Sequence, residues 1–473
     1  MLGIILAAGM GTRMKSSQPK VMHNLVSHPL LEWVLNSYEN LIEDKHCDKI
    51  AVVIGENMPE LENLLKRWSL EKGIDVQIFY QKERLGTGHA VKMAIPAIEK
   101  LQEGEPVYIL CGDVPLIKTE TLKKMRTEHE TRESDLTVLT VEKKDPKGYG
   151  RIIKNQDDDI KQIVEHKDAT SEQLKIKEIN SGMYLVKAEK LRDSLNHLKN
   201  DNQQGEYYLT DIVEWIDQAG GKAISVMTQD HHEVSGINNR YQLSILEKIA
   251  RDRINKAHMI NGVTMIDPEQ VYIDPEVTID IDCIIEPMTV IKGKTTIGRG
   301  CTIGPMTQID DCEIGENNMI ERSHLCGVQI RNNCKIGPFA RLRENTILED
   351  DVKIGDFVET KKTTVGKGSK AQHLSYLGDT TIEEDVNIGA GTITCNYNGY
   401  SKNKTLIEKD AFIGSNTSLV APVKIGKGSI VGAGSVIVRD VPEDSLSIAR
   451  GKQSNKEKRA SELKKKYKKE KEA

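Results

Sequence analysis

The sequence has few aromatic residues and lacks several common signatures. Aromatic side chains make up 4% of the 473 residues, with 4 Phe beside 37 Gly. This composition favours a fold packed by small aliphatic side chains and turns over an aromatic-rich β-sandwich. Because no run of about eighteen apolar residues is present, we predict no membrane-spanning helix. Residues 1–14 are apolar but lack the basic region of a signal peptide.

The cysteines show no CxxC pairing, which disfavours a zinc site or a disulfide framework and fits a reducing cytoplasm. Five of the 8 lie between residues 283 and 334, where we expect small buried apolar side chains. The full set is Cys47, Cys111, Cys283, Cys301, Cys312, Cys326, Cys334 and Cys395. The formal net charge is −5, so we expect neither nucleic acid nor a stable membrane contact as a partner.

The first half of the chain alternates apolar runs with amphipathic patterns. Strands are predicted at residues 3–8, 50–54, 76–80, 107–111 and 136–141, and helices at 29–41 and 60–70. This alternation is typical of an α/β domain, Rossmann-like with a largely parallel or mixed sheet. Ligands of such sheets bind beyond the carboxyl ends of the strands.

The second half has a period of six residues. After a predicted helix over 239–258, aliphatic residues recur six apart from Ile285 to Ile437, and Gly often follows them. A hexapeptide parallel β-helix has this period, and about 150 residues would give roughly eight or nine coils. Two stretches, about 360–381 and 395–406, break the period and are expected to form loops on one face.

These patterns predict four segments along the chain. They are an α/β domain at 1–237, a linker helix at 238–260, a β-helix domain at 261–452 and a basic, solvated C-terminal tail at 453–473.

A phosphate site is predicted after the first strand, where the chain reads LAAGMGTRM and then Pro19-Lys20. The small residues Ala8, Gly9 and Gly11 let backbone N–H groups approach a phosphate, and Arg13 and Lys20 add positive charge. The run is neither a Walker loop nor the GxGxxG dinucleotide fingerprint. Asp113 follows another buried strand, where its carboxylate could hold Mg²⁺ against phosphates.

Further segments of the first half match a known family in order. They are Gln81, Gly86–His89, Gly148–Ile152, Ile163–Lys167, Glu178–Asn180 and Gly236–Arg240. With the phosphate loop and the hexapeptide repeats, they resemble the bifunctional N-acetylglucosamine-1-phosphate uridyltransferases/glucosamine-1-phosphate N-acetyltransferases over nearly the whole chain. Most members have an aromatic residue where this chain has Cys111.

The resemblance implies roles for residues of the first half. The uracil nucleotide would be bound by Leu6, Ala7, Ala8, Gly9, Lys20, Gln81, Gly86 and Thr87. The N-acetylglucosamine moiety would be bound by Gly150, Glu165, Asn180 and Asn238. Asp113 and Asn238 would hold Mg²⁺, and Arg13 and Lys20 would stabilise the charge that develops as UTP reacts.

In the second half, Arg341–Arg343, Glu359–Lys362, HLSYLGD at 373–379 and Asn387–Tyr397 match the acetyltransferase part of the same family. A glucosamine amine must lose a proton before it attacks a thioester, so His373 is the candidate general base. Arg343, Lys361, Tyr376 and Asn387 would bind glucosamine 1-phosphate. Acetyl-CoA would contact Ala390, Asn396, Tyr397, Ser415, Ala433 and Arg450. The resemblance also implies a left-handed coil, a homotrimer and a product used for peptidoglycan and other cell-envelope polysaccharides.

Three alternatives are less well supported by the sequence. A monofunctional sugar-1-phosphate nucleotidyltransferase with a regulatory β-helix would not need HLSYLGD. A nucleotide-exchange subunit of translation initiation with the same two-domain plan would not need Arg13, Lys20 and Asp113 intact. A γ-type carbonic anhydrase would need three zinc-binding histidines, and no suitably spaced set is present.

Overall fold

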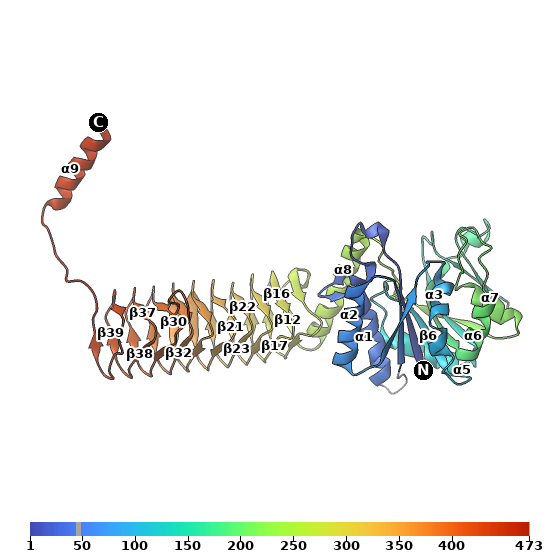
Figure 1. Cartoon of the computed structure of the whole chain (residues 1–473), viewed down its shortest axis with the longest axis horizontal. Coiled ribbons are helices and arrows are strands. Elements are labelled where there is room, and N and C mark those ends of the chain that lie inside the picture. Colours follow the sequence, from blue (N-terminus) through green and yellow to red (C-terminus); the bar gives the residue numbers. More distant parts are fainter. Residues whose placement is uncertain (44–48, 473) are drawn as a thin grey trace. The chain divides into compact units, whose positions relative to one another are not determined.

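The computed structural model describes residues 1–43 and 49–472, so Cys47 lies outside the described residues. The chain divides into two compact units, Met1–Arg251 and Asp252–Ala473, and each is described by itself (Figure 1). Among the described helices, none combines the length and the apolar character needed to cross a membrane.

The first unit is built on a mixed sheet with the strand order β11-β7-β10-β6-β1-β4-β5. The strands are β1 (Leu2–Ala7), β4 (Lys49–Gly55), β5 (Val76–Gln81), β6 (Pro106–Cys111), β7 (Leu136–Glu142), β10 (Glu178–Lys187) and β11 (Ala223–Thr228). β1, β4, β5 and β6 run parallel, whereas β10 runs antiparallel to β6 and β7. A hairpin of β8 (Arg151–Lys154) and β9 (Ile160–Val164) extends from β10, and β2 (Asn24–Leu25) pairs with β3 (His28–Pro29).

Helices cover both faces of this sheet, because side chains alternate along each strand. Ile5 and Ala7 of β1 face one layer, and Leu2 and Ile4 face the other. The first layer contains α1 (Leu30–Glu43), α2 (Pro59–Lys72) and α5 (Thr119–Thr131). The second contains α3 (Thr87–Met93), α4 (Ile95–Ile98), α6 (Ala188–His197) and α7 (Asp211–Gln218). The strands and helices that the sequence predicts in this half are confirmed.

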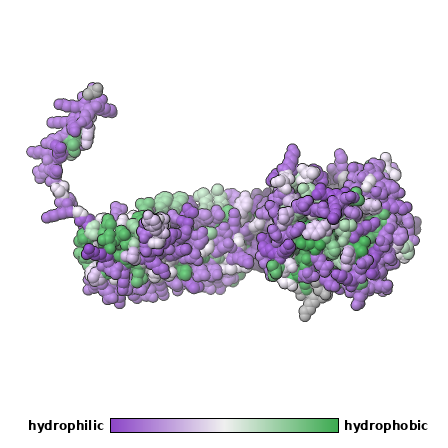
Figure 2. All heavy atoms as spheres, in the orientation of Figure 1, coloured by the Kyte–Doolittle hydropathy of each residue, from purple (hydrophilic) through white to green (hydrophobic). Residues whose placement is uncertain are grey.

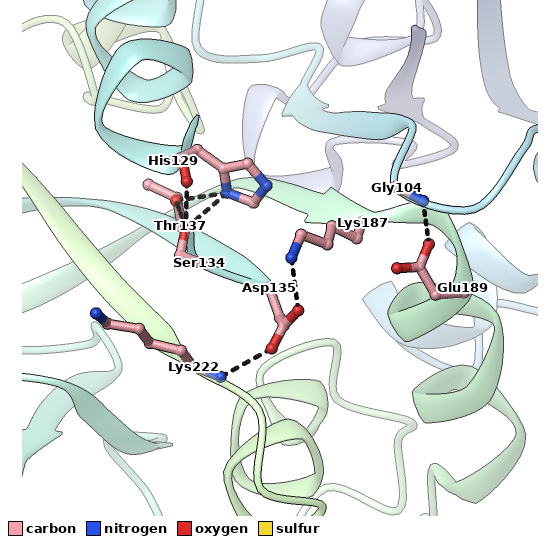
Figure 3. Close-up of polar contacts among 8 residues, drawn as sticks. All are labelled: Gly104, His129, Ser134, Asp135, Thr137, Lys187, Glu189 and Lys222. Atoms are coloured by element: carbon pink, nitrogen blue, oxygen red, sulfur yellow. Dashed lines mark hydrogen bonds and ion pairs between the residues drawn. The ribbon is translucent and has the colours of Figure 1, made fainter. Parts of the chain in front are cut away.

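A buried polar cluster ties the end of α5 to the start of β7 (Figure 3). The His129 Nδ1 atom lies 2.8 Å from the Thr137 hydroxyl and 2.9 Å from the Ser134 hydroxyl. Next to it, the Lys187 ammonium donates to the Asp135 carboxylate at 2.9 Å. Burial is the main cause that lowers the pKa of His129 to about 4, so the ring is neutral in the folded protein at pH 7.

The second unit is a β-helix whose coils contribute strands to three parallel sheets (Figure 1). The first sheet contains β12 (Thr264–Met265), β15 (Ile284–Ile285), β18 (Thr302–Ile303), β21 (Met319–Ile320), β24 (Lys335–Ile336), β27 (Lys353–Asp356), β30 (Lys370–His373), β33 (Asn387–Ile388), β36 (Phe412–Ile413), β39 (Ile430–Val431) and β41 (Leu446–Ser447). The second contains β13 (Val271–Ile273), β16 (Thr289–Lys292), β19 (Gln308–Asp310), β22 (His324–Cys326), β25 (Arg341–Leu342), β28 (Glu359–Lys361), β31 (Tyr376–Gly378), β34 (Ile393–Cys395), β37 (Ser418–Val420) and β40 (Val436–Ile437). The third contains β14 (Thr278–Ile279), β17 (Thr296–Ile297), β20 (Glu313–Ile314), β23 (Val328–Ile330), β26 (Thr346–Leu348), β29 (Thr364–Val365), β32 (Thr380–Ile382), β35 (Thr405–Ile407) and β38 (Val423–Ile425).

The aliphatic residues of the six-residue period form the core of this coil, so the predicted β-helix is confirmed. Cys283, Cys301, Cys312 and Cys334 are buried in that core as expected, whereas Cys326 is half-buried. The longest sheet has 11 strands, more than the eight or nine coils expected. The extra strands lie outside the range from Ile285 to Ile437, because β12 precedes it and β41 follows it; within that range the sheet has nine strands, as expected.

One of the two predicted interruptions of the coil is wrong. Residues 360–381 continue the coil: Lys353 pairs with Lys370, and Lys370 pairs with Asn387. The period fails there because inward positions hold Thr360 and Ala371 in place of large aliphatics, and both are fully buried. The second interruption is a loop, because the next step of the same sheet runs from Asn387 to Phe412.

Two helices lie outside these layers. The helix α8 (Arg240–Ile260) packs Leu246 and Ala250 with Met14 of the first unit, and Ile254 contacts the β-helix core. The helix α9 (Arg459–Glu472) buries no residue, as expected of a solvated basic tail.

Candidate active sites

The parallel strands β1 and β6 bring the predicted phosphate loop and Asp113 to the same edge of the sheet. Leu6 pairs with Cys111, and the Gly112 N–H donates to the Leu6 carbonyl at 2.9 Å. Gly11 adopts a φ of 66°, and a Cβ there would lie 2.5 Å from the Lys20 Cβ. Glycine at this turn therefore lets Lys20 come close to the loop.

The Lys20 ammonium lies between two side-chain oxygen atoms. Its ammonium contacts the Asp113 carboxylate and lies 3.2 Å from the Asn238 side-chain oxygen. Arg13 donates to the same Asn238 oxygen at 2.9 Å. The structure thus brings together all four residues that the sequence assigned to phosphate charge and metal binding.

This cluster fits a magnesium ion. Asp113 and Asn238 offer two hard oxygen atoms that already converge on one cation, the Lys20 ammonium. Mg²⁺ is commonly held by one or two carboxylates, with waters and substrate phosphates as its other ligands. No group of three or more His, Cys, Asp or Glu side chains in residues 1–43 and 49–472 could hold a metal. A metal at Asp113 would therefore depend on the substrate for further ligands.

The start of α8 holds Asn238 in place. The Asn238 N–H donates to the Gln242 side-chain oxygen at 2.8 Å, and the Gln242 N–H donates to the Asn239 side chain at 2.9 Å. This pair is related to a capping box, in which residues at the first turn exchange side-chain and backbone hydrogen bonds. The sequence analysis missed Gln242, because its role depends on where the helix begins.

The loop opens into a pocket of about 290 Å³. Nine residues predicted to bind the nucleotide or metal line it: Leu6, Ala7, Ala8, Gly9, Lys20, Gln81, Gly86, Thr87 and Asp113. Five others also line it: Val21, Arg84, Ala90, Cys111 and Glu206. Arg84 is a cation that the sequence reasoning missed, since it lies between the motifs. Burial raises the pKa of the Cys111 thiol to about 12, which keeps it protonated.

The residues assigned to the sugar form a second group. A Cβ added to Gly150 would lie 3.4 Å from a Glu165 carboxylate oxygen and 3.6 Å from the Asn180 Cβ, so Gly150 opens space between them. The Asn180 amide is fixed, because it donates to the Tyr184 hydroxyl at 2.7 Å and accepts from the Gly182 N–H at 2.9 Å. Burial is the largest cause that raises the pKa of Glu165.

Cys111 connects the two groups. Its thiol lies 3.4 Å from the Gly182 carbonyl, beside the turn that fixes Asn180. The residues assigned to the sugar therefore lie next to the pocket assigned to the nucleotide.

In the second unit, the predicted acetyltransferase residues lie on neighbouring coils. His373 ends β30, exposed to solvent, and Tyr376 begins β31 three residues later. Arg343 donates to Glu359 at 3.0 Å, and Glu359 pairs with Tyr376 across β28 and β31. Lys361 ends β28, and Asn387 begins β33, the strand that pairs with β30. Sequence reasoning missed Glu359 as the partner of Arg343.

The residues assigned to acetyl-CoA follow the coil axis. The Asn416 N–H donates to the Ala390 carbonyl, and the Gly434 N–H donates to the Ser415 carbonyl, each at 2.8 Å. Arg450 reaches the Ala433 carbonyl at 2.6 Å. This places Ala390, Ser415, Ala433 and Arg450 on one column of successive coils.

Asn396 and Tyr397 open the loop that interrupts the coil. Asn396 donates to Asp379 at 2.6 Å. A Cβ on Gly378 would lie 2.5 Å from the Tyr376 hydroxyl and 2.7 Å from the Asn396 amide nitrogen. Tyr376 and Asn396 therefore meet over a glycine, whereas the Tyr397 side chain extends into solvent.

Known families match both units. A nucleotidyl transferase model matches residues 2–234, and a bacterial transferase hexapeptide model of six repeats matches residues 404–439. A model described as the GMPPB C-terminal domain matches residues 268–365.

Curated relatives span almost the whole chain. The bifunctional protein GlmU of Thermosipho melanesiensis is 50% identical over 454 residues, 96% of each chain. The GlmU proteins of Thermotoga maritima and Halalkalibacterium halodurans are 48% and 44% identical, over 97% and 96% of this chain and 98% and 97% of theirs. The chain belongs to the GlmU family. The predicted resemblance is confirmed, and the GlmU relatives are named as bifunctional, which favours an enzyme with a site in each unit over the monofunctional alternative.

Proposed function

We propose that this chain makes UDP-N-acetylglucosamine in two steps, acetylation in the second unit and then uridyl transfer in the first. The observation that carries the proposal is the GlmU relationship, which covers both units at up to 50% identity. The geometry described above supports a separate set of residues for each step. The product would supply peptidoglycan and other cell-envelope polysaccharides, from the cytoplasm.

In the first step, the amine of glucosamine 1-phosphate attacks the thioester carbonyl of acetyl-CoA. His373 accepts the proton that the amine loses, the new C–N bond forms, and the C–S bond breaks to release coenzyme A. Arg343 and Lys361 would bind the sugar phosphate, since a guanidinium can donate two parallel hydrogen bonds to it. Tyr376 and Asn387 would orient the sugar.

In the second step, an oxygen of the sugar 1-phosphate attacks the α-phosphorus of UTP, and pyrophosphate leaves. No general base is needed, because the attacking phosphate is already an anion. Lys20 and Arg13 would stabilise the charge that develops on the phosphates. Mg²⁺ bound by Asp113 and Asn238 would neutralise phosphate charge as well. As the metal and triphosphate bind, Lys20 would turn from Asp113 to the phosphates.

A homotrimer is part of the proposal, since acetyl-CoA would bind between neighbouring β-helices. Large apolar side chains at the corners of the coils support an interface. Met288, Met306, Phe339, Phe357 and Leu374 are each at least 50% exposed. The Phe339 and Phe357 rings stack at 5.3 Å. Hydrophobic residues also gather along one edge of this unit in Figure 2. A contiguous exposed apolar surface of this kind marks an interaction site.

The substrate requirements test the proposal. The protein is incubated with glucosamine 1-phosphate, acetyl-CoA, UTP and Mg²⁺, and UDP-N-acetylglucosamine is measured by chromatography. We expect the product only when all four are present. N-acetylglucosamine 1-phosphate should remove the need for acetyl-CoA. A sugar nucleotide formed equally well without acetyl-CoA from glucosamine 1-phosphate would contradict the proposed order.

A further inference from the structure

The end of β5 holds a side-chain amide in a fixed orientation. Gln81 is 5% exposed, and it lines the nucleotide pocket. Its Nε2 atom donates to the Gly86 carbonyl at 3.0 Å and lies 3.2 Å from the His89 Nδ1 atom. A backbone carbonyl can only accept, so the contact with Gly86 establishes which end of the amide is nitrogen.

The contact between Gln81 and His89 shows which role the His89 Nδ1 atom plays. An amide nitrogen has two hydrogens to donate and no lone pair to offer, so the His89 Nδ1 atom must accept. Both Gln81 hydrogens are used, and among the described residues the Gln81 Oε1 atom has no hydrogen-bond donor. That oxygen is left as an acceptor at the pocket.

His89 itself is held by the packing of α3. The Gly88 N–H donates to the Tyr207 carbonyl at 2.8 Å, and the Tyr207 N–H donates to the Leu85 carbonyl at 2.7 Å. A Cβ on Gly86 would lie 2.6 Å from the Tyr207 carbonyl oxygen, so this approach needs glycine. The His89 and Tyr207 rings lie 6.2 Å apart. The backbone contacts of Tyr207 thus hold the start of α3, which carries His89.

We propose that His89 is a positioning residue that sets the base selectivity of uridyl transfer by holding the Gln81 Oε1 atom toward the base. The inference rests on the proposed function, in which Gln81 binds the uracil of UTP. Uracil has a hydrogen on N3, which an acceptor can bind. Cytosine has a lone pair at N3, which an acceptor repels. A flipped Gln81 amide would present a donor and lose this discrimination.

The test is the ratio of kcat/KM for UTP to that for CTP, measured as pyrophosphate release with N-acetylglucosamine 1-phosphate. His89→Phe keeps an aromatic ring but removes the Nδ1 acceptor. The Gln81 amide would then be held only by its hydrogen bond to the Gly86 carbonyl. We expect the ratio to fall about tenfold, the discrimination that one hydrogen bond commonly provides. A general loss of stability would lower both values and leave the ratio unchanged.

Two further variants make the result specific. His89→Asn offers an amide oxygen close to the position of Nδ1, so it should keep most of the selectivity. His197→Phe preserves a ring stacked on Trp215, away from Gln81, and should leave the ratio at the wild-type value. An unchanged ratio in His89→Phe, or an equal fall in His89→Phe and His89→Asn, would overturn the inference. A wild-type protein that uses neither nucleotide would instead contradict the proposed function.

Discussion

Asp113 is the single residue on which uridyl transfer should depend most. Its carboxylate offers the one full negative charge of the Asp113–Asn238 pair that would hold Mg²⁺. The pair lies in the first unit, whereas the proposed acetyl site lies in the second. Loss of this charge should therefore affect one reaction and spare the other.

We predict that Asp113→Ala lowers uridyl transfer by about a hundredfold to a thousandfold, the scale seen when charge stabilisation is removed from a transition state. Acetyl transfer, followed as thiol release from acetyl-CoA, should stay near the wild-type rate. If both rates fell together in a folded protein, the assignment of Asp113 to one of two separate sites would be wrong.

Substitution of His373 should have the opposite effect on the two reactions. We predict that His373→Ala lowers acetyl transfer by about a hundredfold or more, as loss of a general base does. The same variant should still convert ready-made N-acetylglucosamine 1-phosphate and UTP at the wild-type rate. An unchanged acetylation rate would remove His373 from the mechanism.

The sequence predicts residues whose chemical type is unusual at their position. Asp113 at a strand end and Arg13 and Lys20 near a glycine loop are of this kind. The sequence does not predict Gln242, whose side-chain oxygen accepts a hydrogen bond from the Asn238 backbone N–H. Arg84 was missed for a similar reason, because its place at the pocket depends on how the chain folds around it. The roles of Gly150, Glu165 and Asn180 came from family resemblance, and the structure places these residues together.

For whole strands and helices, periodicity is informative where inward side chains are large. The coil from Ile285 onward was predicted on that basis. Residues 360–381 lack this signal, because Thr360 and Ala371 occupy inward positions that the pattern reserves for aliphatics. A small or hydroxyl side chain at such a position removes the sequence signal without removing the strand.

The contact between α5 and β7 predicts a pH-dependent stability of the first unit. The folded His129 has a pKa of about 4, below its ordinary value of 6.5. Between these values the unfolded chain binds a proton that the folded chain does not, so stability falls as the pH is lowered through this range. The loss from this group should reach about 2 kcal/mol at pH 5.

Calorimetry of the full chain between pH 7 and pH 4.5 measures this effect in the unfolding transition of the first unit. His129→Gln replaces the titrating ring with a neutral polar group, so its transition should shift less with pH than that of the wild type. Parallel shifts in the two proteins would show that another group is responsible.

In the assembled protein, the proposed trimer depends on the apolar corners of the β-helix. We predict that Phe339→Asp with Phe357→Asp dissociates the proposed trimer, because two charges would replace the stacked rings that would face a neighbouring chain in it. Analytical ultracentrifugation should give a mass near that of one 52.9 kDa chain, in place of three. Acetyl transfer should be lost and uridyl transfer kept.

A matched control is Leu70→Asp, which adds a charge at an apolar residue of α2 that is 84% exposed. It should leave mass and both activities unchanged. A wild-type protein that sediments as a single chain would contradict the trimer directly.

The two proposed sites would act in sequence, and we expect the acetylated intermediate to diffuse freely from one site to the other. Mixing Asp113→Ala with His373→Ala tests this expectation most directly, with glucosamine 1-phosphate, acetyl-CoA, UTP and Mg²⁺ as the starting materials. Each variant alone should form no UDP-N-acetylglucosamine, whereas the mixture should form it after a lag in which N-acetylglucosamine 1-phosphate accumulates. A mixture as inactive as either variant, with both proteins folded and each retaining its expected single activity, would contradict the account.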